Sequence, residues 1–439
     1  MITVIGGGPG GYTAAIRAAQ LGSEVTLIEM EEIGGCCLHW GCIPAKVFLK
    51  ASKLYSQLGL GKSYGVSARP SPFDIRKLLE KKEDVRQKLT AGLKNVLRSY
   101  DVHIVHGKGV VIDQHTVRFN EDEIPSEKII VATGSEPEVP HLFEEMVLSS
   151  REVFQLEYLP RSVMVVEGGI FSLEMAWFFR ELGSQVTLLT DQFIEKEFED
   201  IGGRIELYFK NHGVGTIQGR ITSIKKSDNQ KIVEVNGQEI MAEEVVWMNR
   251  KPVLDALPGS LIKDGRVSVN DHMQTDLPDV YAVGDITGSY LGGDAIAQGN
   301  VAAEHAMGHS SAYRGALIPK VMYAPEAAVV GLTYQQAVDR GYEVVKGSFP
   351  YGGSGRAQTM GAVQGRVTLL SDKKYGEILG ANILGKGATE LIHMISFSMM
   401  MEITVTELST LLCAHPTMME TIRDACLDVH GNSLNMPKK

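Results

Sequence analysis

The sequence has little of what marks several large protein classes. Only 5 of its 439 residues are Cys, and three of these lie within seven residues, which is unlike the disulfide framework of a small secreted protein. No apolar run reaches the roughly 18 residues that a membrane-spanning helix needs. The first residues, MITVIGGGPGG, lack the basic region of a secretory signal. We therefore expect a cytoplasmic protein without membrane insertion, whose clustered cysteines form a redox or metal site.

An excess of basic residues is also missing. The 43 Lys and Arg are outnumbered by 53 Asp and Glu, and the net charge of −10 argues against nucleic acid as a partner. The content of 44% hydrophobic and 22% charged residues is ordinary for a folded protein and excludes disorder as the main state. At roughly 150 residues per domain, the length suggests about three domains.

An internal repeat organises the chain. Residues 2–29 and 163–190 match at a constant offset of 161, and both are typical of a strand, a glycine-rich turn, a helix and a second strand. In the first copy, Gly6, Gly8 and Gly11 form a G-x-G-x-x-G turn, and Glu29 ends the second strand. This arrangement predicts a dinucleotide-binding unit: pyrophosphate lies at the helix N-terminus, and the carboxylate binds ribose hydroxyls.

The second copy has changes at the positions that contact the ligand. Glu167 replaces the first glycine, Ser172 replaces the third, and Thr190 takes the place of the acid, although Asp191 follows it. Gly168 and the middle glycine, Gly169, remain. A carboxylate ~4 Å from a phosphate charge costs about 4 kcal/mol at an effective dielectric of 20, half of the about 8 kcal/mol of micromolar binding.

The cysteine cluster lies in the segment GGCCLHWGCIPAK at 34–46. Cys37 and Cys42, on the opening turns of a helix, are near enough for a disulfide, and a helix N-terminus favours thiolate. A zinc site and inert buried thiols are the alternatives. Zinc needs four ligands, and His39 is the nearest extra candidate, so we favour a redox pair and expect no metal.

Five motifs together resemble the pyridine nucleotide–disulfide oxidoreductases, and among them the dihydrolipoamide dehydrogenases. In chain order they are GGGPGG at 6–11, GGCCLHWGCIPAK at 34–46, VATGS at 131–135, YAVGDITG at 281–288 and AHPTMMETI at 414–422. The resemblance covers nearly the whole chain. It implies an α/β fold with two Rossmann-like three-layer domains, which bind FAD and NAD(P), and an α+β dimerisation domain at the C-terminus.

The resemblance also implies domain boundaries and partners. These are an FAD-binding domain at 1–141, an NAD-binding-like domain at 142–258, a returning FAD-binding or central part at 259–317 and a dimerisation domain at 318–439. It implies a homodimer that acts on a lipoylated carrier protein or on a small dithiol or disulfide. It further implies tightly bound, non-covalent FAD.

Roles follow from the resemblance, residue by residue. Cys42 is the charge-transfer thiol against the flavin and Cys37 the interchange thiol. His415 with Glu420 is the acid–base dyad that each subunit contributes to the other, and Glu174 pairs with Lys46 near the flavin. The residues implied along FAD are Gly6, Gly8, Gly11, Glu29, Lys46, Gly107, Thr133, Gly134, Asp285 and Ala295. Gly168, Gly169 and Glu174 are the corresponding candidates for NAD.

Independently of the resemblance, dithiol–disulfide chemistry requires these residue types. Dithiol–disulfide exchange proceeds through thiolate attack and a mixed disulfide. Histidine suits the transfer of thiol protons near neutral pH, and a carboxylate orients its ring.

The sequence departs from the family pattern mainly around the second dinucleotide unit. Related enzymes have a stretch like Ala-x-Gly-Arg-x-Pro beside the nicotinamide, where this chain has Trp247 and Asn249 in VVWMNRKP. No Arg cluster follows Thr190 to hold a 2′-phosphate, so NAD is favoured over NADP. Three hypotheses follow: a dihydrolipoamide dehydrogenase-like enzyme that uses NAD(H), the same dithiol half-reaction with a non-nicotinamide electron partner, and a non-catalytic flavin-bound sensor or assembly subunit.

Two further cysteines lie close to the implied site. Cys36 adjoins the redox pair, and Cys413 lies two residues before His415. We favour inert small residues at both positions. The alternative is that Cys413 extends the thiol relay.

Overall fold

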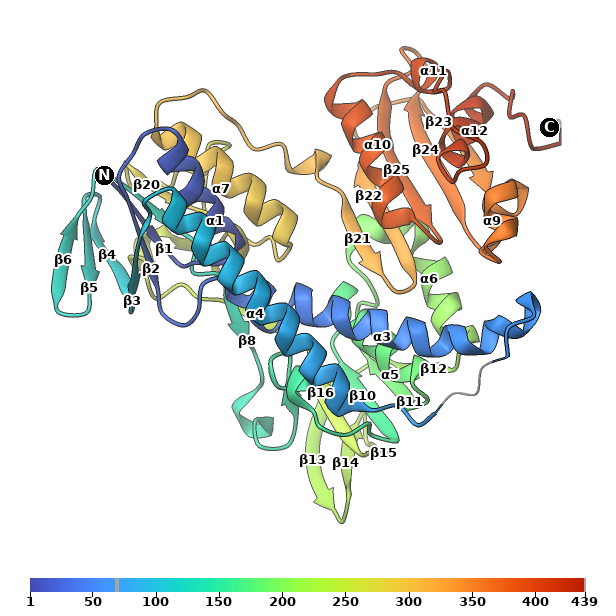
Figure 1. Ribbon diagram of the computed structural model, residues 1–439, viewed down its shortest axis with the longest axis horizontal. Helices are drawn as coiled ribbons and strands as arrows, with labels where there is room; N and C mark the ends of the chain where they lie inside the picture. Colours follow the sequence, from blue (N-terminus) through green and yellow to red (C-terminus); the bar gives the residue numbers. More distant parts are fainter. Residues whose placement is uncertain (68–70, 438–439) are drawn as a thin grey trace. The chain divides into compact units, whose positions relative to one another are not determined.

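The computed structural model describes residues 1–67 and 71–437, and the chain folds into two compact units (Figure 1). The first unit consists of Met1–Val163 and Thr222–Arg314, and the second of Met164–Ile221 and Gly315–Lys439. The four-part division expected from the sequence groups the residues differently and stays a prediction.

A five-stranded parallel sheet forms the centre of the first unit. In spatial order its strands are β20 (Val280–Ala282), β7 (Lys128–Val131), β1 (Ile2–Ile5), β2 (Val25–Glu29) and β3 (His103–His106). Apolar side chains predominate on both faces of the central strands, as expected for a parallel sheet that is covered on both sides.

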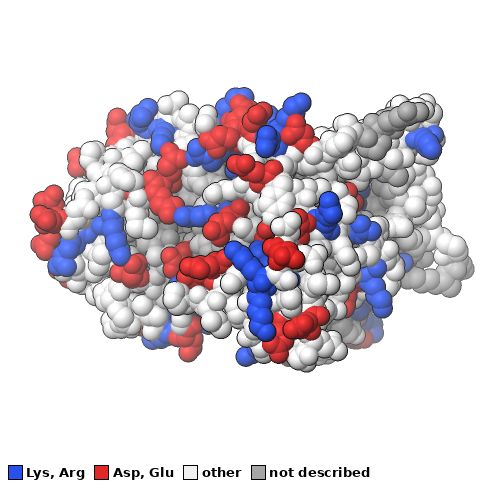
Figure 2. Space-filling view, turned by 90° about the horizontal axis from the view of Figure 1, so that it is seen from below, with Lys and Arg blue, Asp and Glu red and all other residues white. Residues whose placement is uncertain are grey.

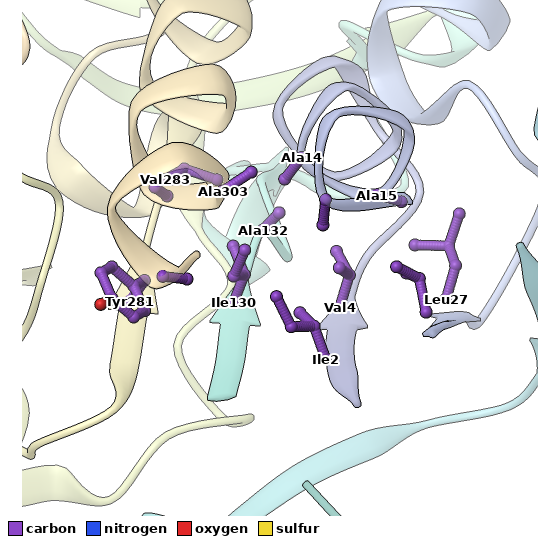
Figure 3. Close-up of a cluster of buried hydrophobic side chains, with 14 of the residues drawn as sticks. Ile2, Val4, Ala14, Ala15, Leu27, Ile130, Ala132, Tyr281, Val283 and Ala303 are labelled. Atoms are coloured by element: carbon purple, nitrogen blue, oxygen red, sulfur yellow. The ribbon is translucent and has the colours of Figure 1, made fainter. Parts of the chain in front are cut away.

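Helices cover one face of this sheet and a small antiparallel sheet covers the other. Successive strand residues point to opposite faces, so Ile2 and Val4 pack with helices α1 (Pro9–Gln20) and α7 (Gly292–Ala306), as Figure 3 shows. Ile5 packs into the core on the other face. That core includes residues from the antiparallel sheet of β4 (Gly109–Asp113), β5 (Thr116–Phe119) and β6 (Asp122–Pro125). The first unit is therefore a three-layer α/β fold.

Other elements of the first unit surround this core. The helices are α2 (Gly35–His39), α3 (Cys42–Leu60) and α4 (Ile75–Ser99), and Gly284–Thr287 forms a short 3-10 helix, η6. The strand pairs are β8 (Ser135–Pro137) with β17 (Arg250–Pro252), β9 (Leu148–Ser149) with β16 (Glu244–Trp247) and β18 (Ile262–Lys263) with β19 (Arg266–Val267). An antiparallel sheet contains β13 (Ile221–Ser227), β14 (Gln230–Val235) and β15 (Gln238–Ala242).

The second unit contains the other copy of the repeat. Its parallel strands are β10 (Ser162–Val166), β11 (Gln185–Leu189) and β12 (Val214–Ile217), joined through α5 (Ile170–Glu181) and α6 (Glu199–Asn211). Helices α1 and α5 each have 12 residues, and both begin and end at positions 161 residues apart. The duplicated sequence therefore folds into matching strand–turn–helix–strand units.

An antiparallel sheet with helices forms the C-terminal part of the second unit. In spatial order its strands are β21 (Lys320–Tyr323), β22 (Glu326–Gly331), β25 (Ile378–Leu384), β24 (Arg366–Asp372) and β23 (Val344–Pro350). Its helices are α8 (Tyr334–Asp339), α9 (Gly355–Thr359), α10 (Ala388–Met400), α11 (Val405–Leu408) and α12 (Glu420–Val429). Helices α10 and α12 pack on the sheet. The predicted fold class, two α/β units and an α+β C-terminal part, is confirmed.

Acidic and basic side chains are interleaved on the face shown in Figure 2. Within residues 1–67 and 71–437, no helix has both the length and the apolar character to cross a bilayer. In the same ranges, no three His, Cys, Asp or Glu side chains are grouped so that they would hold a metal ion.

Candidate active site

The cysteine segment forms two consecutive helices rather than the single helix expected. Cys37 lies on α2, and Cys42 is the first residue of α3. Between them the chain bends at Gly41, where a side-chain Cβ would lie 2.9 Å from Cys36 Sγ, so a larger residue does not fit there without a shift. All five cysteines are free thiols, and a hydrogen bond joins Cys37 and Cys42. The bend, rather than one continuous helix, brings the pair together.

The surroundings of the pair shift the pKa of Cys37 in both directions. The hydrogen bond with Cys42, followed by burial, raises the pKa of Cys37, whereas the charge of Lys46 lowers it. Burial raises the pKa of Tyr12, and the charges of Cys37 and Cys42 raise it further. Lys46 lies four residues after Cys42 on α3, on the same helix face. Helix α7 also begins nearby, because a Cβ at Gly292 would lie 3.9 Å from Cys42 Sγ.

The first glycine-rich turn has the backbone of a dinucleotide site. Gly6 has φ +100°, and a Cβ there would lie 2.3 Å from Ala132 O. A Cβ at Gly11 would lie 1.8 Å from Gly6 O, so the third glycine lets α1 approach the strand closely. Around Gly8 the nearest atom to such a Cβ is 3.9 Å away. The turn is therefore open where a phosphate would lie.

Glu29 lies at the end of β2, as the sequence predicts, and its carboxylate faces the turn. It accepts hydrogen bonds from Gly7 N at 2.6 Å and Glu31 N at 2.7 Å. Gly107 N donates to Glu29 O at 2.9 Å. These bonds fix the acid at the edge of the same turn where a ribose would bind.

The other predicted FAD residues follow the carboxyl ends of the parallel strands β7 and β20 or lie on α7. Thr133 Oγ1 donates to Val253 O at 2.6 Å; Gly134 has φ +70°, and no described atom lies within 4 Å of where its Cβ would be. Ala295 is buried on α7, and a Cβ at Gly284 would lie 3.5 Å from its side chain. Asp285, on η6, accepts a hydrogen bond from Ser135 Oγ at 2.5 Å. The strand ends, η6 and the start of α7 thus surround one region of the first unit.

Arg250 is a site residue that the sequence reasoning did not select. Its Nη1 lies 3.5 Å from Asp285 Oδ2 and donates to Cys36 Sγ at 3.4 Å, and its Nη2 donates to Tyr290 O at 3.2 Å. Burial raises the pKa of Asp285, while Arg250 and the hydrogen bond from Ser135 act against that shift. The sequence did carry a signal for it, because Arg250 matches the Arg of the Ala-x-Gly-Arg-x-Pro pattern within VVWMNRKP.

These residues fit a bound FAD. FAD has phosphate groups and a polyol chain. The open turn at Gly8 leaves room for the phosphates, and the carboxyl groups of Glu29 and Asp285 can accept hydrogen bonds from the hydroxyls of the ligand. The cysteine pair lies in the same unit, and Gly292 beside Cys42 begins the helix that carries Ala295.

His415 and Glu420 form a hydrogen-bonded pair in the second unit. His415 Nδ1 lies 3.0 Å from Glu420 Oε1, and Glu420 Oε2 accepts a bond from Thr417 N at 3.0 Å. Burial alone would raise the pKa of Glu420, but His415, Thr417 and Arg423 together lower it. The His415 side chain is 79% exposed. The ring is therefore oriented by a carboxylate and accessible from outside the unit.

Cys413 lies close to this pair. Burial, followed by the charges of Glu420 and Asp424, raises the pKa of Cys413 against the opposing charge of Arg423, and its Sγ lies 3.7 Å from Leu411 O. Its thiol form is thus favoured over the thiolate.

The second glycine-rich turn has the same backbone path as the first, but the position where a phosphate would lie is occupied. Glu167 has φ +77° at the position of the first glycine, and Ser172 is buried. Instead of an empty phosphate position, Glu195 lies against the turn: Ile170 N donates to its Oε1 at 2.9 Å and its Oε2 at 3.1 Å. The sequence reasoning missed Glu195 because no motif spacing points to it.

Comparison with known proteins decides the family. A model of the pyridine nucleotide-disulphide oxidoreductases matches residues 1–308, and the model of that family's dimerisation domain matches residues 318–426. The chain belongs to the pyridine nucleotide-disulphide oxidoreductase family. It is a flavoprotein disulfide oxidoreductase, and its dimerisation domain suggests a homodimer.

Similar members of the family are dihydrolipoyl dehydrogenases. The chain is 33% identical over 457 residues to the enzyme of Geobacillus stearothermophilus, covering 99% of this chain and 97% of the relative. It is 32% identical over 460 residues to that of Halobacterium salinarum, with the same coverage. In fold it is similar to LpdA from Mycobacterium tuberculosis, with a TM-score of 0.90, 24% identity and coverage of 97% and 98%. The flavoprotein disulfide reductase RclA from Escherichia coli has a TM-score of 0.85 at 24% identity, with the same coverage.

Glu174, which was predicted as a site residue, and two residues of the segment that departs from the family pattern all lie in protein contacts. Glu174 is fully buried on α5 and accepts a hydrogen bond from Tyr323 N at 2.8 Å; its pairing with Lys46 stays a prediction. Trp247 is buried and stacks on Phe143, with 5.9 Å between ring centroids. Asn249 Nδ2 donates to Glu138 at 2.6 Å. The unusual segment is therefore packed within the first unit.

Proposed function

We propose that this chain oxidises a lipoyl-type dithiol, on a carrier protein or as a small molecule, and passes both electrons to FAD through the Cys37–Cys42 pair. The observation that carries this proposal is the hydrogen-bonded pair of thiols beside Lys46, in a unit whose glycine turn and Asp285 fit FAD. Full-length similarity to dihydrolipoyl dehydrogenases favours a lipoyl dithiol over other dithiols.

The exchange runs in two substitutions at sulfur. A thiolate of the substrate attacks Cys37 Sγ of the oxidised pair, the Cys37–Cys42 bond breaks, and Cys42 leaves as a thiolate. The second substrate sulfur then attacks the sulfur bound to Cys37, which releases the oxidised substrate and Cys37. Two electrons have then moved from substrate to protein, and two thiol protons have been released.

Two positive groups favour the thiolates that this exchange releases, although hydrogen bonding and burial leave the pKa of Cys37 raised. The ammonium of Lys46 lowers the pKa of Cys37 against the shift from its hydrogen bond and burial. The start of α7 lies beside Cys42 Sγ, and the positive end of a helix dipole stabilises an anion there.

His415 and Glu420 are proposed to move the two protons. Because Nδ1 of the ring lies 3.0 Å from Glu420 Oε1, Nε2 is left to take a proton from a substrate thiol and return it. The carboxylate also stabilises the charged ring. We propose that each subunit of the dimer supplies this pair to the cysteines of the other, which agrees with the exposure of His415.

Bound FAD supplies a two-electron acceptor for the reduced cysteine pair. Gly6, Gly8, Gly11 and Glu29 would hold its dinucleotide part, and Asp285 with Lys46 would lie nearer the cysteines.

Two electron partners are candidates for the flavin. NAD(H) is the partner expected of a dihydrolipoamide dehydrogenase-like enzyme. A non-nicotinamide acceptor, such as a protein carrier, is favoured by a specific observation: the carboxylate of Glu195 lies where the second unit would bind pyrophosphate.

The test is turnover of dihydrolipoamide with an artificial electron acceptor such as ferricyanide. We expect the wild type to turn over, and Cys42→Ser and His415→Gln to lose at least 100-fold in kcat. His141→Gln is a matched control, because His141 is also exposed and lies 3.0 Å from a carboxylate, that of Glu144. No turnover by a wild type that holds FAD would overturn the proposal and favour the non-catalytic class.

A further inference from the structure

The loop after β11 folds back onto the second glycine-rich turn. Thr190 starts this path: its Oγ1 donates to Gln192 O at 2.6 Å and accepts from Gln192 N at 3.1 Å. A Cβ at Gly168 would lie 1.7 Å from Gln192 O, and Gly169 N donates to Phe193 O at 3.1 Å. The residue that replaces the ribose-binding acid therefore directs the loop onto the turn.

Glu195 completes this contact at the start of α5. Both of its carboxylate oxygens accept a hydrogen bond from Ile170 N, and a Cβ at Gly169 would lie 2.7 Å from its Oε1. The N–H groups of Gly169 and Ile170 are those that a dinucleotide-binding turn directs at pyrophosphate. In this chain both are already bonded to the protein itself.

The first unit provides an internal comparison at the same register. Gly8 matches Gly169, yet the nearest atom to a Cβ at Gly8 is 3.9 Å away, and that atom belongs to Gly35. The residue that matches Ile170 is Pro9, which has no N–H to donate, and no side-chain cap hydrogen bond is made at Gly8. The same fold thus has an open helix N-terminus in one copy and a carboxylate at it in the other.

The charges reinforce the contact. A carboxylate at a helix N-terminus is stabilised by the helix dipole and by the first N–H groups, as a phosphate is. A pyrophosphate would have to displace Glu195 and leave this carboxylate nearby, with no opposite charge gained. Asp191, at the start of the same loop, accepts a hydrogen bond from Gly219 N, which lies 3.2 Å from Asp191 Oδ1.

We propose that Glu195 is an internal anion that closes the pyrophosphate position of the second unit and excludes NAD(H). It is a specificity-determining residue, and the flavin then gives its electrons to an acceptor of another class. This inference rests on the proposed function only for the source of those electrons.

The experiment measures NADH binding to the FAD-loaded protein by isothermal titration calorimetry. The variants are Glu195→Ala, which removes the carboxylate, and Glu195→Gln, which keeps an acceptor for Ile170 N but no charge. Glu197→Gln is the matched control, because Glu197 lies in the same loop but binds Lys320 Nζ, at 2.5 Å. Anaerobic bleaching of the flavin by dihydrolipoamide is followed separately in each protein.

We expect no NADH binding below millimolar concentration for the wild type and Glu197→Gln. Glu195→Ala should bind at least tenfold more tightly than either, and Glu195→Gln should lie between them. Micromolar binding by the wild type would overturn the proposal, as would equal weakness of all four proteins, each shown to be folded by its flavin spectrum. If dihydrolipoamide fails to bleach the flavin, the proposed function fails, while the binding results still decide the role of Glu195.

Discussion

Arg250 and Asp285 form a largely buried ion pair, with 3.5 Å between Nη1 and Oδ2 and side-chain exposures of 11% and 15%. The same guanidinium donates to Cys36 Sγ and to Tyr290 O. Arg250, on β17, therefore links two separate parts of the predicted FAD site, η6 and the cysteine segment.

Removing this guanidinium should be costly. Arg250→Met leaves the Asp285 carboxylate without its charged partner, and breaking such a pair costs about 3–5 kcal/mol. Burial already raises the pKa of Asp285, and the loss of Arg250 raises it further. An acid whose folded-state pKa is raised destabilises the protein as the pH rises from the ordinary value of 3.8 toward the raised pKa, so the deficit should grow over that window and stay constant above it. Urea unfolding across this range measures it.

The double variant Arg250→Met with Asp285→Asn serves as the control for this pair. It removes both charges, so it should recover part of the stability that Arg250→Met loses. A single variant as stable as the wild type at pH 8 would contradict the importance of the pair.

Glu167→Gly should stabilise the chain. Glu167 has φ +77° at the position of the first glycine, and a left-handed backbone costs a non-glycine residue roughly 1–2 kcal/mol. Because glycine also loses more backbone entropy on folding, the expected net gain is about 0.5–1 kcal/mol. Glu206→Gly, on an exposed position of the regular helix α6, should instead cost about 1 kcal/mol. Thermal unfolding should show a gain of stability in Glu167→Gly and a loss in Glu206→Gly. A loss of stability in Glu167→Gly would contradict the assignment of backbone strain at this residue.

Local patterns were enough to predict the repeated units. Helices α1 and α5 match at the 161-residue offset because glycine spacing and apolar periodicity act over a few neighbouring residues. Glu29 could be placed at its turn for the same reason, and the hydrogen bond between His415 and Glu420 spans only five residues.

Contacts that depend on the path of a loop could not be predicted in this way. Glu195 bonds to Ile170, 25 residues earlier, and Arg250 reaches Cys36, 214 residues earlier. Neither contact has a fixed motif spacing. The replacement of the ribose-binding acid by Thr190 was visible in the sequence, but its use as the start of a loop that closes the turn required the fold.

Cys36 and Cys413 should be dispensable for dithiol turnover. Burial raises the pKa of Cys36 to about 12, and burial raises that of Cys413 as well, so neither is a thiolate near neutral pH. We expect Cys36→Ser and Cys413→Ser to keep kcat with dihydrolipoamide within threefold of the wild type. A loss of more than tenfold in Cys413→Ser, with the His415 pair intact, would revive the thiol relay.

The free energy of unfolding should depend on pH through Glu195, in the direction expected of a buried acid. Burial raises the pKa of Glu195, although the bond from Ile170 N lowers it in part. The folded state therefore binds a proton more readily than the unfolded state. Stability should rise as the pH falls from neutral through the raised pKa toward the ordinary value near 4.5. Glu195→Gln should lack this rise, and parallel stability curves for the two proteins from pH 7 down to the ordinary value of 4.5 would contradict the prediction.

Glu420→Gln tests what the carboxylate of Glu420 adds to catalysis while the imidazole of His415 is still present. The amide keeps the size of Glu420 and accepts a hydrogen bond, but it no longer stabilises a positive charge on His415, 3.0 Å away. We expect kcat with dihydrolipoamide and ferricyanide to fall about 10- to 100-fold with KM little changed, less than the loss in His415→Gln, because the base itself remains. The lowered pKa of Glu420 means that its carboxylate stabilises the fold above about pH 4.5 and that this contribution is lost as the pH falls. A measured kcat equal to that of the wild type between pH 6 and 8 would show that the carboxylate acts on the fold and not on proton transfer.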